Sequence, residues 1–254
     1  MLQIGLAMTT PISVFMITYH RPDTVAKVLA ALAEADGDFH VFLIDNSAGA
    51  IDHILNQYDN NGRFSIFRND KNIGKGLTYK KWFLELIAQD ENEYFLSLDD
   101  DAMMPKDFIV KYQNGYEAAT VEFDKKEVMV LSPVLTDSDE HDIDHQITQG
   151  YLLYHGIAPD FKSDLIIQKA SHLCGAAFLI NKKLFIKHGF YGTEQIYGGD
   201  DAYVCNVCVV HDYGIGIITN FLVCHHSNQG DPEYIKWKGK NLTNSELRKG
   251  HYDQ

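Results

Sequence analysis

Short apolar segments alternate with longer amphipathic segments over the first hundred residues of the chain. Residues 12–17 form a continuous apolar run rich in β-branched side chains, which predicts a strand buried on both faces. A helix is predicted to begin at Pro22, because apolar residues then recur with helical spacing as far as Leu32. The alternation continues with strands predicted at 40–44, 64–67 and 94–98 and with helices predicted at 51–58 and 77–88. Strands and helices that alternate in this way predict βαβ units and a parallel sheet with right-handed crossovers.

The pattern in the second half of the chain is more mixed. Strands are predicted at 128–133, 166–169, 176–180 and 215–224, the last as one extended strand or a pair, with a short helix at 182–188. A turn at 198–201 leads into another helix, and residues 136–148 are predicted to form a polar loop. Because neither a repeat nor a linker rich in proline or serine interrupts the sequence, we expect one α/β domain.

Polar residues stand directly after several of the predicted strands. Thr18 and Tyr19 follow the first strand, Asp45 follows the second and Asp99 follows the fourth. In an open α/β sheet the carboxyl ends of the strands line the crevice in which ligands bind. The sequence therefore predicts a ligand site at this edge of the sheet.

The composition is that of a globular protein with a large negative charge. Hydrophobic residues make up 45% of the chain, charged residues make up 22%, and the net charge is −13. We expect no nucleic-acid partner, because a phosphate backbone requires a basic surface. A nucleotide is compatible with this charge, since a divalent cation can neutralise a diphosphate locally. The acidic residues at 137–144 and the basic stretch at 236–249 are interpreted as solvated segments, with contact to a membrane or to phosphates as the alternative for the basic stretch.

The four cysteines and the ends of the chain suggest an intracellular protein. Four cysteines in 254 residues do not form a disulfide framework. Cys205 and Cys208 lie in an apolar run that predicts a packed helix, and zinc binding is the weaker alternative because no second pair supplies two more ligands. The sequence has neither a signal-peptide pattern nor an apolar run long enough to span a membrane. We expect a cytoplasmic protein, with peripheral contact to the inner face of a membrane left open.

Three consecutive aspartates, Asp99, Asp100 and Asp101, follow the fourth predicted strand. Adjacent carboxylates repel one another, and a bound divalent cation removes that repulsion. Carboxylate oxygens suit Mg²⁺ or Mn²⁺, so the motif indicates a metal site. The alternative is a surface turn in which the aspartates cap a helix before Pro105.

Two further motifs place polar side chains at the ends of predicted elements. Asp200 and Asp201 follow Gly199 at the start of a helix. Asp201 is expected to cap this helix, and one of the two carboxylates is expected to serve as a general base. His225 and His226 stand at the end of the last strand, where neighbouring side chains point to opposite faces, so at least one is expected to point inward.

In their order and spacing these motifs resemble the family 2 glycosyltransferases, which are inverting enzymes with the GT-A fold. The resemblance extends from about residue 12 to residue 241. It is carried by residues 17–22 (the opening strand and donor-binding turn), 43–47 (the second strand), 69–76 (the Asn-x-Gly segment beside the nucleoside), 99–105 (the metal motif), 175–177 with 189–190 (the acceptor side) and 199–201 (the base). The fold that the resemblance implies is a Rossmann-like GT-A domain, with a mostly parallel central sheet flanked by helices.

The resemblance implies a role for each motif residue. Asp101 would bind Mn²⁺ or Mg²⁺ together with His226 or His225, of which we favour His226. Asp201 would be the catalytic base, and Asp200, which stands where the family has glutamate, would orient the acceptor. Contacts with the nucleotide-sugar donor are implied for Thr18, Tyr19, Arg21, Asp45, Asn72, Gly74, Lys75, Asp99 and Asp100.

The implied reaction moves a sugar from a nucleotide to the hydroxyl of a glycan, a lipid-linked intermediate or another acceptor, in glycan or polysaccharide synthesis. If Asp45 accepts the ring N–H of uracil or thymine, the donor is UDP- or dTDP-linked. Residues of about 10–133 would bind the nucleotide sugar, those of about 134–241 the acceptor, and 242–254 would form a tail.

Three alternatives remain open at this point. A sugar nucleotidyltransferase has a similar sheet, but residues 18–22 contain no glycine for a phosphate-binding loop. A phosphatase with an aspartyl nucleophile would carry its aspartates after the first strand rather than the fourth. A catalytically inactive nucleotide-sugar-binding module would share the fold, although the combination of Asp45, Asp101 and Asp201 with a strand-end histidine weighs against it.

Overall fold

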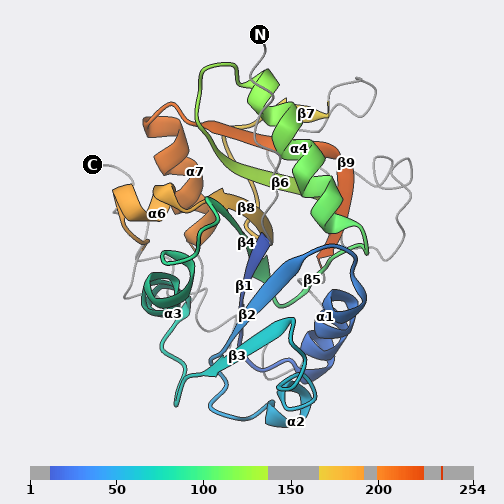
Figure 1. Cartoon of the computed structure of the whole chain (residues 1–254). Coiled ribbons are helices and arrows are strands. Elements are labelled where there is room, and N and C mark those ends of the chain that lie inside the picture. Colours follow the sequence, from blue (N-terminus) through green and yellow to red (C-terminus); the bar gives the residue numbers. More distant parts are fainter. Residues whose placement is uncertain (1–11, 137–165, 192–198, 226–235, 237–254) are drawn as a thin grey trace.

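The computed structural model of the chain describes residues 12–136, 166–191 and 199–225, together with Lys236. In these ranges one nine-stranded sheet has the strand order β3-β2-β1-β4-β8-β6-β9-β5, and β7 pairs with β9 (Figure 1). The strands are β1 (Ile12–Thr18), β2 (Phe39–Asp45), β3 (Phe64–Arg68), β4 (Tyr94–Asp99), β5 (Ala102–Met103), β6 (Val128–Thr136), β7 (Ile167–Lys169), β8 (Ala177–Asn181) and β9 (Gly214–His225).

The first half of the sheet is parallel, as the alternating pattern predicts. β1 pairs in parallel with β2 on one side and with β4 on the other, and β2 pairs in parallel with β3. Six of the seven side chains of β1 are buried, because other elements pack against both faces of the sheet at this central strand. The carboxyl ends of these strands therefore lie at one edge of the sheet.

The second half of the sheet is mixed. β8 is antiparallel to both β4 and β6, β9 is parallel to β6, and both β5 and β7 are antiparallel to β9. The register between β6 and β9 shifts between Pro133 and Val134, whose partners are Ile218 and Leu222. Such a bulge bends a strand, and the end of β9 then reaches β5, where His225 pairs with Ala102. The predicted strand at 215–224 is one continuous strand.

Helices cover both faces of the sheet. In the described ranges they are α1 (Pro22–Glu34), α2 (Asp52–Leu55), α3 (Lys75–Trp82), α4 (Phe108–Glu122), α6 (Lys183–His188) and α7 (Asp200–Val210). α1 and α4 pack on one face and α3, α6 and α7 on the other, as Figure 1 shows. Cys205 and Cys208 are buried and free in α7, which confirms the predicted packed helix. No helix of the described residues is both long and apolar enough to cross a membrane.

Some elements differ from the predicted pattern. The helix predicted at 77–88 is α-helical only as far as Trp82 and continues as a π-helical turn, Phe83–Ile87. The helix predicted at 51–58 is reduced to the four residues of α2, because residues rich in asparagine, aspartate and glycine follow it and favour turns. The predicted loop at 136–148 lies outside the described residues except for Thr136, which ends β6.

Candidate active site

Five elements of the structure have one of their ends at the same group of polar and charged side chains. Thr18, Asp45 and Asp99 are the last residues of the parallel strands β1, β2 and β4. Lys75 is the first residue of α3, and His225 is the last residue of β9. The structure thus gathers the predicted polar residues at the carboxyl edge of the sheet, as expected for an α/β ligand site.

Asp100 joins the turn after β1 to the turn after β4. Its Oδ2 accepts hydrogen bonds from the hydroxyl of Thr18 at 2.8 Å and from the backbone N–H of Tyr19 at 3.3 Å. Its Oδ1 accepts a hydrogen bond from the guanidinium group of Arg21. Asp100 is buried, so these bonds fix the two turns against each other. Its contact with the donor, like those of Thr18 and Tyr19, stays a prediction.

Arg21 is a buried cation in a strained turn. His20 and Arg21 both have left-handed backbone angles, with φ of 56° and 62°, which non-glycine residues adopt uncommonly. Arg21 forms ion pairs with Asp100 and with Asp101, the latter between Nη1 and Oδ2 at 2.6 Å. The turn therefore directs a guanidinium group onto the acidic motif and compensates part of the carboxylate repulsion that the sequence indicates. Its contact with the donor stays a prediction.

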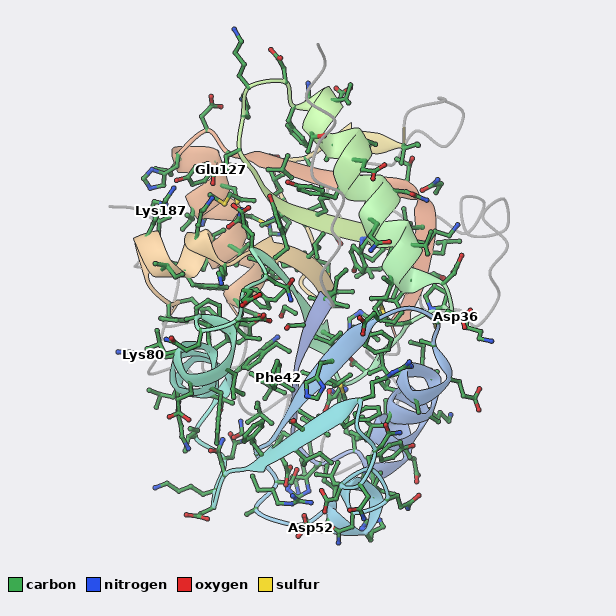
Figure 2. All side chains as sticks on the ribbon, viewed as in Figure 1. Asp36, Phe42, Asp52, Lys80, Glu127 and Lys187 are labelled. Atoms are coloured by element: carbon green, nitrogen blue, oxygen red, sulfur yellow. The ribbon has the colours of Figure 1, made fainter. Side chains whose placement is uncertain are left out.

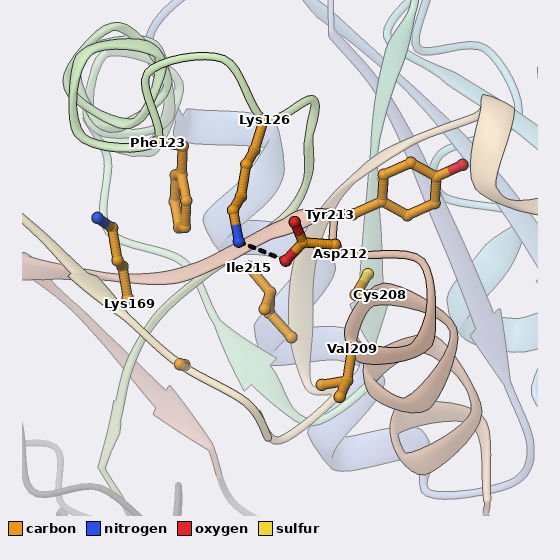
Figure 3. Close-up of a pocket in the computed structure, with 9 residues that line it drawn as sticks. Phe123, Lys126, Lys169, Cys208, Val209, Asp212, Tyr213 and Ile215 are labelled. Atoms are coloured by element: carbon orange, nitrogen blue, oxygen red, sulfur yellow. Dashed lines mark hydrogen bonds and ion pairs between the residues drawn. The ribbon is translucent and has the colours of Figure 1, made fainter.

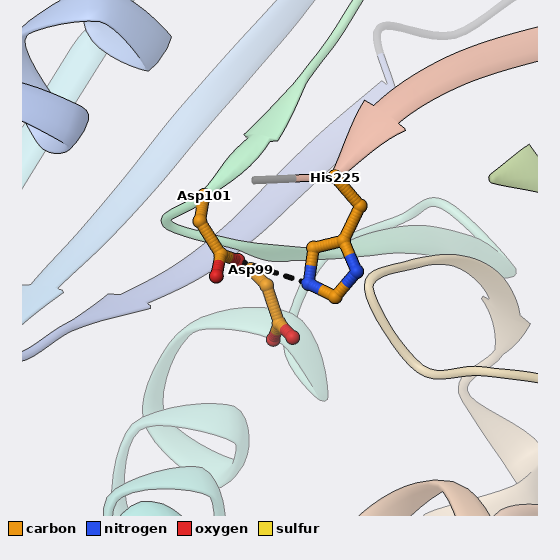
Figure 4. A group of neighbouring side chains, drawn as sticks. All are labelled: Asp99, Asp101 and His225. Atoms are coloured by element: carbon orange, nitrogen blue, oxygen red, sulfur yellow. Dashed lines mark ion pairs between the residues drawn. The ribbon is translucent and has the colours of Figure 1, made fainter. Parts of the chain in front are cut away.

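Asp99, Asp101 and His225 form a group that fits a divalent cation (Figure 4). One ligand atom from each residue lies within 4.8 Å of the others. The Nε2 atom of His225 is 3.3 Å from Oδ1 of Asp101, and both side chains are largely buried. Two carboxylates and one imidazole are suitable ligands for Mn²⁺ or Mg²⁺. The pairing of β5 with β9 brings His225 to the acidic motif, whereas His226 lies outside the described residues and its role stays a prediction.

The surroundings of Asp99 and Asp101 shift the pKa values of these two side chains in opposite directions. Burial favours a higher pKa for Asp101, but the hydrogen bond from His225 and the charge of Arg21 outweigh it and lower the pKa below its usual value. Burial raises the pKa of Asp99, and the positive charge of Lys75 only partly opposes this effect. Asp101 is accordingly an ionised carboxylate at neutral pH, as a metal ligand must be.

Lys75 connects the acidic motif to α7. The Oδ1 atom of Asn72 accepts the backbone N–H of Gly74 at 2.8 Å, and Gly74, with φ of 82°, turns the chain into α3. This turn places the ammonium group of Lys75 2.8 Å from Oδ1 of Asp99 and 2.5 Å from Oδ2 of Asp200. The sequence pattern did not predict this contact, because residues 75 and 200 meet only in the folded chain. The donor contacts expected of Asn72, Gly74 and Lys75 stay predictions.

Asp200 and Asp201 form the first turn of α7, next to the acidic motif. The N-cap residue of the helix is Gly199, with φ of 90°, so Asp201 is not the cap that the sequence predicts. Its Oδ1 instead accepts the backbone N–H of Ala202 at 2.7 Å. Burial, followed by the negative charge of Asp200, raises the pKa of Asp201. A carboxylate with a raised pKa is a stronger proton acceptor, which suits a general base.

Asp45 is fully buried at the end of β2 with one oxygen unused. Its Oδ1 accepts the backbone N–H of Ser47 at 2.7 Å, whereas Oδ2 has no hydrogen-bond partner among the described residues. A buried acceptor without a donor is unfavourable unless a ligand supplies one. Asn46 and Asn69 support this corner through a hydrogen bond of 2.8 Å between their side chains. The unused oxygen suits recognition of an N–H group.

Near Asp200 and Asp201, Tyr191 was missed by sequence reasoning, whereas Gly175 belongs to a segment that carries the resemblance. Burial raises the pKa of the Tyr191 hydroxyl well above its usual value, with a further contribution from the charge of Asp200. The same hydroxyl has no hydrogen-bond partner among the described residues. Gly175 leaves room for the acidic pair, because a Cβ atom there would lie 3.2 Å from Cβ of Asp201. The only available signal for Tyr191 was that it directly follows residues 189–190, which resemble the acceptor side.

Two cavities lie elsewhere in the described part of the molecule. One of about 250 Å³ is lined partly by Phe123, Lys126 and Tyr213, and its lining includes an ion pair between Lys126 and Asp212 (Figure 3). The other, of about 420 Å³, lies beside Ser13 and His40 near the amino ends of β1 and β2. Neither of these two cavities is lined by a residue of the acidic group.

Comparison with known proteins agrees with the resemblance in the sequence. The sequence profile of the family described as "Glycosyl transferase family 2" matches residues 13–189, more than half of the chain. No curated protein gives a significant match to the chain.

Solved structures of similar fold share little sequence with the chain. A mannosyltransferase from Pyrobaculum calidifontis in complex with GDP-Man and Mn²⁺ has a TM-score of 0.61 and 14% identity over 90% of this chain and 60% of its own. TarS from S. aureus (residues 1–349) in complex with UDP-GlcNAc has a TM-score of 0.59 and 15% identity over 87% of this chain and 60% of its own. GalNAc-T7 with UDP, GalNAc and Mn²⁺ has a TM-score of 0.59 and 12% identity over 89% of this chain and 46% of its own. The chain thus spans 60% or less of these structures, and the likeness shows the GT-A fold.

Proposed function

The chain belongs to glycosyltransferase family 2, and from this premise we propose that it transfers a sugar from a nucleotide donor to an acceptor hydroxyl with inversion of configuration. The observation that carries the proposal is the arrangement of two acidic groups around Lys75. Asp99 lies on one side of its ammonium group and Asp200, followed by Asp201, lies on the other. A donor held at the strand ends would thus face an acceptor held at the start of α7.

The proposed reaction is a single displacement. The acceptor oxygen forms a bond to the anomeric carbon, while the bond from that carbon to the diphosphate oxygen breaks and its electron pair leaves with the nucleoside diphosphate. Asp201 receives the proton of the acceptor hydroxyl, and its raised pKa makes this transfer more favourable. Asp200, whose negative charge the Lys75 ammonium compensates, is suited to accept a hydrogen bond from the acceptor and orient it.

Asp99, Asp101 and His225 are the residues that would hold a divalent cation. When bound there, the cation would stabilise the negative charge on the diphosphate leaving group. Arg21 keeps the Asp101 carboxylate in place by binding its Oδ2. The Mn²⁺ in two of the structures of similar fold is consistent with this assignment.

The base of the donor is proposed to be uracil or thymine. These bases present one ring N–H between two carbonyl groups, and Oδ2 of Asp45 is a single unused acceptor. Guanine presents two adjacent N–H donors, and cytosine has no N–H at this ring position. Loss of such a buried hydrogen bond costs on the order of 1–3 kcal/mol, enough to discriminate between bases. Residues of about 10–133 are proposed to bind the donor and those of about 134–241 the acceptor.

A two-stage experiment tests the function. Thermal melting with Mn²⁺ or Mg²⁺ and each of UDP, dTDP, GDP and CDP identifies the nucleotide, because a ligand of the folded state raises the melting temperature. UDP- and dTDP-linked hexoses are then incubated with water alone or with a panel of methyl glycosides, and the release of nucleoside diphosphate and the new glycoside are measured. We expect transfer from at least one donor. Binding of a nucleotide sugar without hydrolysis or transfer would instead identify a catalytically inactive binding module.

A further inference from the structure

Lys75 lies at the meeting point of three elements that are far apart in the sequence. It is the first residue of α3, and its ammonium group bridges Asp99, the last residue of β4, and Asp200, the first residue of α7. The exposed fractions of the three side chains are 20%, 28% and 18%. They are therefore partly shielded from bulk water and still accessible to a substrate at the strand ends.

The position of Lys75 is poorly suited to stabilising helix α3 itself. The amino end of a helix carries a partial positive charge, so a lysine in the first turn of α3 is repelled by the helix dipole. Its ammonium group also loses much of its hydration. The position of the Lys75 ammonium group is therefore better explained by its two carboxylate partners, Asp99 and Asp200, than by any stabilisation of α3.

The bridge distinguishes the two neighbouring carboxylates of α7. Asp200 forms an ion pair with Lys75 at 2.5 Å, whereas none of the ion pairs found among the described residues involves Asp201. The ammonium group of Lys75 occupies Oδ2 of Asp200. The geometry thus favours Asp201 over Asp200 for accepting the proton.

We propose that Lys75 is a positioning residue that ties Asp200 to Asp99, so that the acceptor is held at a fixed distance from the donor and Asp201 alone accepts its proton. The inference rests on the proposed function and deepens it. It assigns to Lys75 a role in transfer, through Asp200, rather than in the binding of the nucleotide. Misplacement of reacting groups by about 1 Å can lower a rate roughly 10²-fold, so loss of the bridge is expected to act mainly on turnover.

The test replaces Lys75 by methionine, which keeps most of the length of the side chain but removes its charge. With the donor and methyl glycoside found active for the unaltered protein, Lys75→Met is expected to lower kcat of transfer by about 10- to 100-fold. The Kd for the nucleoside diphosphate, measured by calorimetry, is expected to change by less than about threefold. Lys75→Arg, which keeps the charge, should recover part of the turnover.

Lys80→Met is the matched control. Lys80 lies on the same helix, is exposed and points away from the molecule (Figure 2). The substitution Lys80→Met removes the same charge from α3 but leaves the bridge between Asp99 and Asp200 intact. The values of kcat and Kd are therefore expected to stay within about twofold of those of the unaltered protein. A comparable loss of kcat in Lys80→Met would show that net charge, rather than the bridge, is responsible and would overturn the inference.

A double-mutant cycle with Asp200→Asn separates positioning from a general effect on the fold. If Lys75 acts through Asp200, adding Lys75→Met to Asp200→Asn should lower kcat little further. Additive losses, or a tenfold rise in nucleotide Kd with kcat unchanged, would overturn the inference. Equal transfer by Lys75→Met and the unaltered protein would overturn the inference alone, whereas absence of transfer by the unaltered protein would overturn the proposed function and the inference with it.

Discussion

Asp200 and Asp201 are neighbours in the sequence but have different surroundings in the fold. Asp200 contacts the ammonium group of Lys75, whereas Oδ1 of Asp201 accepts the backbone N–H of Ala202 at 2.7 Å. Burial and the nearby negative charge of Asp200 raise the pKa of Asp201. The two side chains are chemically identical, so their different roles must come from these contacts.

At the scale of single residues, the different contacts predict that Asp201 and Asp200 contribute unequally to turnover. Asp201→Asn keeps the size of the side chain and an oxygen that can accept the N–H of Ala202, but it cannot take a proton. We expect kcat of transfer to fall by roughly 10²–10⁴-fold, with nucleotide Kd unchanged. Asp200→Asn should have the smaller effect, and steady-state kinetics of both variants measure the difference. The reverse order of effects would assign the base to Asp200.

The raised pKa of Asp201 also predicts how stability depends on pH. A buried carboxylate whose pKa is higher in the folded state contributes stability that is present below its unfolded pKa and lost as the pH rises through its folded pKa. At neutral pH ionised Asp201 therefore destabilises the fold relative to a neutral side chain.

Asp201→Asn should accordingly melt at a slightly higher temperature than the unaltered protein at pH 7. This difference should shrink as the pH falls through the raised pKa of Asp201 and vanish below the ordinary pKa that Asp201 has in the unfolded chain. Melting curves of the two proteins between pH 7 and pH 4 measure it. A constant difference across this range would mean that burial of the charge is not its cause.

At the scale of elements, the packing of α4 explains both a gap in the sequence prediction and a constraint on the fold. The buried positions of α4 have helical spacing, but two of them, Gly115 and Ala119, are small. Val110 and Val121 are apolar and exposed on the same helix. The contrast between an apolar and a polar face is therefore weak, and the pattern did not predict this helix of 15 residues.

The parallel strands, by contrast, could be predicted because their signal is local. A short apolar run in the sequence predicts each of the strands β1 to β4. The polar residues at the ends of three of these strands were expected to lie at one edge of the sheet. Which strands of the second half would pair was not predictable from local pattern. The contact between His225 and Asp101 depends on the pairing of β5, a strand of two residues, with β9. The bridge of Lys75 to Asp200 depends in the same way on tertiary packing.

Gly115 offers a test of the packing between α4 and β9. A Cβ atom at this position would lie 2.7 Å from Cγ1 of Ile218, far inside van der Waals contact. Gly115→Ala is therefore expected to destabilise the protein by about 1–3 kcal/mol in urea unfolding, despite the higher helix propensity of alanine. Gly62→Ala is the control, because its Cβ atom would have no neighbour within 4 Å. Equal stability of the two variants would mean that α4 can move away from β9 without cost.

The molecule as a whole carries a net charge of −13, and the site adds to this a dense local charge. Five aspartates gather there: Asp99, Asp100, Asp101, Asp200 and Asp201. Among the described residues, Arg21 and Lys75 are the cations that form ion pairs with them. A diphosphate would bring further negative charge into this field. Its binding therefore requires a compensating cation, whereas a nucleoside without phosphates carries no such charge.

The last prediction follows from this difference between a nucleotide and its nucleoside. Mn²⁺ should strengthen the binding of UDP by tenfold or more in calorimetry, and by reciprocity UDP should strengthen the binding of Mn²⁺ by the same factor, a coupling of about 1.4 kcal/mol for each tenfold. Uridine keeps the ring N–H that Asp45 is proposed to accept, so its weaker binding should be the same with Mn²⁺ or with a chelator.

His225→Ala should reduce the coupling for UDP, because it removes one ligand of the proposed metal group, and should leave uridine binding unchanged. His226→Ala measures the contribution of the neighbouring histidine in the same way. Equal binding of UDP with Mn²⁺ and with a chelator would show that the acidic group needs no metal to hold the donor.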